Sequence, residues 1–92
     1  MDELQMKIIN KTDLHFFRYC EDNYGINRGV YNTIDQWFYK KDIHCITERR
    51  LYIIEFLKCA FGPDKGSDKF GKGRGKVTSR LHDFWIQKTK IL

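Results

Sequence analysis

The sequence predicts a small, mostly α-helical domain of four helices, with a glycine-rich basic loop before the last helix. Helix-capping residues and glycine stops bracket two segments, and in two others apolar residues recur at the helical spacing i, i+4, i+7 and i+8. A chain of 92 residues has room for one hydrophobic core. Residues 1–92 are therefore expected to form a single domain.

Capping residues predict the first two helices. Residues 1–9 fit a strand and a helical turn equally well, and the choice stays open. Thr12 is suited to cap a helix and Gly25 to end it, which predicts a helix over 13–24. Asn27 can cap a second helix. Its apolar residues share one narrow arc: Val30, Ile34, Trp37 and Phe38.

The third helix is expected to be the central one. Thr47 with Glu48 can open it, and Gly62 followed by Pro63 can close it. The residues between these signals are apolar on nearly all sides of a helix. A helix with so little polar surface is typically packed on by the others.

The net positive charge of the chain comes from its last third. The net charge is +5 at pH 7, and the charges of residues 1–62 cancel, so the whole excess lies in 63–92. Most of the glycines fall within 62–76, which predicts a flexible basic loop there. The last helix follows this loop. Its apolar residues are Val77, Leu81, Phe84 and Trp85.

The cysteines indicate a reducing compartment. Cys20, Cys45 and Cys59 are odd in number, widely spaced and in apolar contexts, as reduced core thiols are. No Cys or His pair has the spacing of a zinc site, so neither a metal nor another cofactor is expected. No apolar run approaches the length of a membrane span. The sequence thus predicts a soluble intracellular protein that does not contact a membrane.

Two regions carry candidate nucleic-acid contacts. The polar face of the second helix holds Arg, Asn and Gln, which pair with base edges from a helix in the major groove. Asp35 lies within this face, where it would repel phosphates. A solvated polar face is the alternative for this helix. The predicted contacts are Arg28, Asn32, Gln36, Tyr39, Lys40 and Lys41 from the helix, and Lys65, Lys69, Phe70, Lys72, Arg74, Lys76 and Arg80 from the loop and its end.

The segment 13–62 resembles the helix-turn-helix DNA-binding domains. Gly25 stands at the turn, and Ile34 and Trp37 lie on the helix that would enter the groove. The register is shifted, because the position six residues after the turn glycine is Tyr31. The resemblance implies DNA as the partner. It also leaves a homodimer open, since such modules commonly bind two half-sites.

The basic loop suits a polyanion. Its glycines let backbone N–H groups approach phosphates, its cations release counterions, and Phe70 can stack on a base. A soluble connector with incidental charge is the alternative. Gly66, Gly71 and Lys72 have the spacing of a phosphate-binding loop, but Gly73 replaces the residue that would hold Mg²⁺. Nothing marks a cysteine as an activated nucleophile, so no enzymatic activity is expected.

The sequence therefore favours a small non-enzymatic regulator that binds nucleic acid, DNA before RNA. The alternative is a protein-binding effector or inhibitor that docks on a nucleic-acid enzyme complex and places its basic loop in a phosphate channel or acidic groove. The small size, odd cysteines and dense aromatic residues suit a regulator of viral or mobile-element origin.

Overall fold

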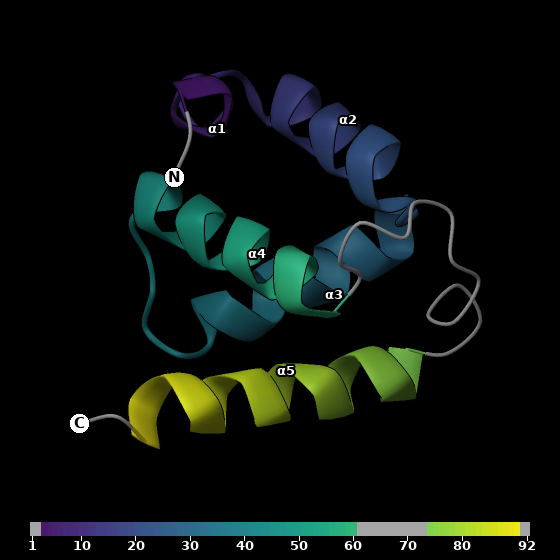
Figure 1. The fold of residues 1–92 in the computed structure, drawn as a ribbon, viewed down its shortest axis with the longest axis vertical. Helices are drawn as coiled ribbons and strands as arrows, with labels where there is room; N and C mark the ends of the chain where they lie inside the picture. Colours follow the sequence, from purple (N-terminus) through teal and green to yellow (C-terminus); the bar gives the residue numbers. More distant parts are fainter. Residues whose placement is uncertain (1–2, 61–73, 91–92) are drawn as a thin grey trace.

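The computed structural model describes residues 3–60 and 74–90, and all the regular secondary structure in this part of the chain is α-helix, as predicted. Figure 1 shows α4 in the middle, α1 and α2 on one side of it and α5 on the other. None of the described helices combines the length and apolar character needed to cross a lipid bilayer. The helices are α1 (Glu3–Ile8), α2 (Asp13–Tyr24), α3 (Arg28–Tyr39), α4 (Ile46–Ala60) and α5 (Arg74–Lys90).

The caps set the boundaries of α2 and α3 where the sequence predicts them. The side chain of Thr12 accepts a hydrogen bond from the backbone N–H of His15 (3.3 Å) and begins α2. Gly25 ends this helix in the left-handed region, at φ 69°. The side chain of Asn27 accepts from the backbone N–H of Val30 (2.8 Å) and begins α3.

The other boundaries correct the expectations. The helix count rises from four to five in the described residues, because 3–8 form α1. Helix α4 begins at Ile46, ahead of Thr47, since the carbonyl of Cys45 already accepts the Arg49 N–H at 2.9 Å. The stop at Gly62 and Pro63 lies outside the described residues.

The predicted loop over 62–76 is wrong at its end. Residues 74–76 form the first turn of α5, so this helix begins ahead of Val77. The first turn of α5 contains no apolar residue, so the apolar spacing that predicts the rest of the helix does not extend to it. The rest of the predicted loop, 62–73, lies outside the described residues.

Helices α3 and α4 share the centre of the fold. Each contacts α2, α5 and the other, so the central place predicted for α4 alone is shared with α3. The middle of the core is aromatic, and the fully buried Phe38 lies within 6.5 Å, centroid to centroid, of five other rings. These rings are Trp37, Tyr52, Phe56, Phe84 and Trp85.

A buried arginine ties α4 to the connection between α1 and α2. Arg50 is only 4% exposed, and its Nη1 donates to the carbonyl oxygens of Ile9 (3.0 Å) and Lys11 (2.7 Å). Its Nη2 pairs with the carboxylate of Asp13. Its guanidinium carbon lies 5.0 Å from the centre of the Phe16 ring. Arg50 therefore has a structural role, because its charge is buried and paired within the fold.

The cysteines are not all core thiols. Cys20 is buried, but Cys45 and Cys59 are exposed, which corrects the expectation of three core cysteines; all three are free. The apolar neighbours of Cys45 and Cys59 in the sequence lie on other sides of the chain, so they do not cover these thiols.

The thiols should react at two separate rates. Burial raises the pKa of Cys20 to about 12, so this thiol stays protonated and shielded at mildly alkaline pH. We expect an aromatic disulfide reagent to titrate Cys45 and Cys59 at once in the native protein, and Cys20 only after guanidinium is added. Absorbance of the released thiolate measures both phases, and a third thiol titrating at the native rate would contradict the burial of Cys20.

Candidate nucleic-acid interface

The predicted contact residues of the second helix lie together on one exposed face. Arg28, Asn32 and Gln36 follow each other at intervals of four residues along α3, and all are exposed. Lys40 and Lys41 continue this face beyond the end of the helix. The face points outward because the residues on the opposite side of α3 are buried in the core: Val30, Ile34 and Phe38.

Three residues of this face, Asn32, Gln36 and Lys40, lie on one wall of a groove between α3 and α5. The groove measures about 550 Å³ and is open to solvent. Its polar side-chain groups are two amides, two hydroxyls, one ammonium and the indole N–H of Trp37, a set that includes both hydrogen-bond donors and acceptors. It is lined by Gly29, Asn32, Thr33, Gln36, Trp37 and Lys40 of α3 and by Thr78 of α5.

Asp35 does not present a free negative charge on this face. Its carboxylate is partly buried and accepts a hydrogen bond from Nε of Arg49 at 2.7 Å. Arg49 also donates through Nη1 to the carbonyl oxygens of Ile43 (3.0 Å) and His44 (3.3 Å). Because the carboxylate is paired with a guanidinium, the repulsion of phosphates expected from Asp35 is largely cancelled.

Aromatic rings hold two of the exposed cations. The guanidinium carbon of Arg28 lies 4.7 Å from the centre of the Phe17 ring of α2. Lys41 Nζ lies 5.0 Å from the centre of the Trp37 ring. Cation–π contacts of this kind restrict a long side chain without removing its charge from solvent. Both ends of the α3 face therefore carry a positioned positive charge.

Tyr39 and Tyr31 have separate surroundings on α3. Tyr39 is 46% exposed, and its ring lies 4.4 Å from the ring of His44. Tyr31, the residue at the shifted position of the helix-turn-helix pattern, packs edge-on against Phe17 with ring centres 5.3 Å apart. Burial, helped by nearby Asp35, raises the pKa of Tyr31 well above its ordinary value. Its hydroxyl is therefore neutral at physiological pH.

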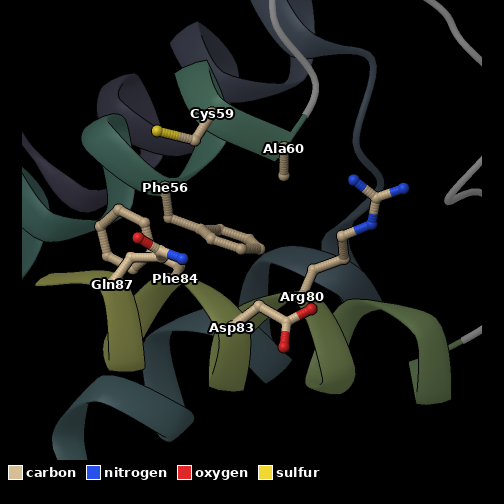
Figure 2. Close-up of a pocket in the computed structure, with 7 residues that line it drawn as sticks. All are labelled: Phe56, Cys59, Ala60, Arg80, Asp83, Phe84 and Gln87. Atoms are coloured by element: carbon tan, nitrogen blue, oxygen red, sulfur yellow. The ribbon is translucent and has the colours of Figure 1, made fainter. Parts of the chain in front are cut away.

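Some of the remaining predicted contact residues lie on α5, and the others lie outside the described residues. Arg74 and Lys76 belong to the first turn of α5, and Arg80 is exposed further along this helix. Arg80 does not line the groove, because it lies on the opposite side of α5, where a second pocket opens against α4 (Figure 2). The other predicted loop contacts lie outside the described residues: Lys65, Lys69, Phe70 and Lys72.

Sequence reasoning missed several residues of these surfaces. Thr78 in the groove carries no charge and gives no signal by itself. Asp83 and Gln87 of the second pocket follow Arg80 at i+3 and i+7, so a helical wheel of the last helix places all three on one side. Arg49 gives no signal either, because nothing in the sequence separates it from an exposed cation.

Comparison with known proteins gives one informative similarity. No family model matches the chain, and no solved structure matches it significantly. The chain is similar to part of a curated bacterial RNA-binding protein. This relative is the RNA-binding riboflavin kinase RibR of Bacillus subtilis (strain 168), 38% identical over 78 residues. The match covers 83% of this chain but 34% of the relative, so the chain spans about a third of the relative's length.

Proposed function

We propose that this chain is a non-enzymatic RNA-binding module, and that RNA binds the exposed face of α3 and the groove beside it. The observation that carries the proposal is an open groove whose α3 wall includes Asn32, Gln36 and Lys40, with the exposed Arg28 one turn before them on the helix. Cations along this helix attract the phosphates, and the amides between them can read the bases.

The choice of RNA rests on the relative. The sequence alone favours DNA, but the curated similarity is to a protein described as RNA-binding. We infer that the matched third of RibR corresponds to its RNA-binding part. Unpaired RNA bases expose their edges to amide and guanidinium groups, which suits the side chains of the groove. The relative is bacterial and gives no support to a viral or mobile-element origin.

The helix-turn-helix resemblance and the homodimer stay predictions, since neither comparison nor structure tests them. The proposal assigns RNA recognition to α3 and depends on neither the helix-turn-helix resemblance nor dimerisation. A dimer would place two such faces on one ligand and raise the apparent affinity through the linked second contact.

The double variant Lys40→Ala/Lys41→Ala tests the electrostatic contribution of these lysines to RNA binding. Fluorescence anisotropy with mixed-sequence single-stranded RNA, duplex RNA and duplex DNA, at about 50 and 200 mM salt, measures affinity and its salt dependence. We expect RNA to bind more tightly than DNA. We also expect the variant to weaken binding to all RNA sequences alike, and to flatten the salt slope by about 0.7 per lost single-strand contact.

The matched control removes the same charge elsewhere. Lys7→Ala/Lys11→Ala changes two exposed lysines at α1 and the segment after it; α1 contacts α2 but not α3. This control should leave the slope unchanged. Asn32→Ala/Gln36→Ala should instead alter which RNA sequences bind. DNA bound more tightly than RNA would overturn the choice of RNA. No binding at low salt would overturn the proposal and favour the protein-binding effector.

A further inference from the structure

A second pocket lies on the side of α5 that faces away from the α3 groove. It measures about 250 Å³ and opens between the C-terminal half of α4 and the middle of α5. Figure 2 shows the ring of Phe56 reaching from α4 toward α5, the ring of Phe84 beside Gln87, and Asp83 and Arg80 further along α5. The pocket therefore combines an aromatic floor with a polar rim.

The aromatic floor is held in place by the core. Phe56 is 1% exposed, and its ring meets that of Phe84 nearly at a right angle, with centres 5.6 Å apart. Phe84 also packs against Phe38, at 6.1 Å between ring centres, and lies under the ammonium group of Lys88. Phe84 is only partly buried, so the pocket has an apolar aromatic wall that a planar ligand can contact.

The polar rim comes from one stripe of α5. Arg80, Asp83 and Gln87 are exposed and lie at i, i+3 and i+7, on the same side of the helix as Phe84. An ionised carboxylate only accepts hydrogen bonds, a guanidinium only donates them, and a side-chain amide does both. The rim thus offers two adjacent acceptor oxygens, an amide one turn away, and a cation at the mouth.

We propose that this pocket binds one unpaired guanine base of an RNA ligand, an inference that rests on the proposed RNA-binding function. Guanine presents two neighbouring N–H donors on its Watson–Crick edge, which the Asp83 carboxylate can accept, and next to them a carbonyl oxygen for the Gln87 amide. Arg80 is placed to contact the phosphate. The volume lies just below the range of pockets for drug-sized ligands, which is about 300–1,000 Å³, and so suits a single base.

The other bases fit this rim less well. Adenine, cytosine and uracil each place an acceptor atom on the Watson–Crick edge beside the single donor they offer. That acceptor would face the second oxygen of Asp83, and two facing acceptors leave each other unsatisfied. The selectivity therefore resides in Asp83, whereas stacking on the aromatic wall is shared by all bases.

The test compares uridine octamers that differ in one central base. Fluorescence anisotropy measures the affinity of the full chain for octamers carrying guanine, inosine or adenine. The base of inosine, hypoxanthine, is guanine without the exocyclic amine, so the inosine octamer lacks one of the two donors and is otherwise unchanged. We expect the guanine octamer to bind about tenfold more tightly than the others, which is within the range of one bidentate base contact. Asp83→Asn should abolish that ratio.

The control is Asp22→Asn, which removes the same charge from an exposed site on α2. Any general gain in RNA affinity from the lost negative charge appears in both variants, but only Asp83→Asn should change the guanine-to-inosine ratio. Equal affinity for all octamers would overturn the guanine site while leaving RNA binding intact.

A second measurement separates the pocket from RNA binding as a whole. Titration of ¹⁵N-labelled protein with guanosine monophosphate should shift the side-chain amide signals of Gln87, and inosine monophosphate should shift them less. If the nucleotide shifts these signals but no octamer binds, the proposed function fails and the guanine site stands. If neither is seen, both fail.

Discussion

Replacing Phe38 by alanine should remove a large part of the stability of the domain, about 4 kcal/mol in the free energy of unfolding. The side chain is fully buried at the point where α3, α4 and α5 meet, and five aromatic rings surround it. Truncation leaves a cavity that neighbouring rings cannot fill, since large planar side chains have few alternative packings.

Urea denaturation followed by circular dichroism measures the loss. A domain of 92 residues is expected to have a total stability of roughly 5–14 kcal/mol, so Phe38→Ala should remove between about a third and most of it. Leu14→Ala is the control, because Leu14 is exposed on α2 and its truncation should cost less than about 0.5 kcal/mol. Similar denaturation midpoints for the two variants would contradict the aromatic centre of the core.

Replacing Arg50 by methionine should cost about 3 kcal/mol. Methionine fills most of the same volume but cannot donate to the carbonyl oxygens of Ile9 and Lys11, which then lose their partner. The ion pair with Asp13 adds little, because that carboxylate is 87% exposed. Most of the lost stability should therefore come from the two unpaired carbonyl groups. Because these groups are uncharged, the difference in stability between Arg50→Met and the unmodified protein should not depend on salt concentration.

Arg18→Met is the matched control for this substitution. Arg18 is exposed on α2, so the same change of side chain there should alter the denaturation midpoint only slightly. If Arg50→Met is no less stable than Arg18→Met, Arg50 does not hold the α1–α2 connection on α4.

The parts of the fold that were predicted correctly are those with local causes. Thr12, Gly25 and Asn27 act on backbone groups within a few residues, so the limits of α2 and α3 are readable from the sequence. Periodicity correctly predicts three buried residues of the α3 arc, Val30, Ile34 and Phe38, whereas Trp37 of the same arc is only partly buried and lines the groove. The start of α5 has no such signal, so the sequence predicts a loop where the first turn of this helix lies.

The parts that were missed depend on contacts between distant segments. Arg50 is separated by about 40 residues from the carbonyls it binds, and no local pattern distinguishes it from a surface cation. The exposed face of α3 was predicted from helical spacing, but its groove requires knowing that α5 packs beside it. The same contact decides that Arg80 lies away from that groove.

The packing of α5 beside α3 sets the width of the proposed RNA-binding surface. Packed helices have axes about 8–10 Å apart and diameters of about 10–12 Å, so the pair is about 20 Å across. The major groove of B-form DNA is about 12 Å wide and admits a single helix. The broad, shallow minor groove of an RNA duplex, or a single strand lying across both helices, meets no such limit. Under the proposed function, the width of this helix pair favours RNA over DNA by shape, independently of the base sequence.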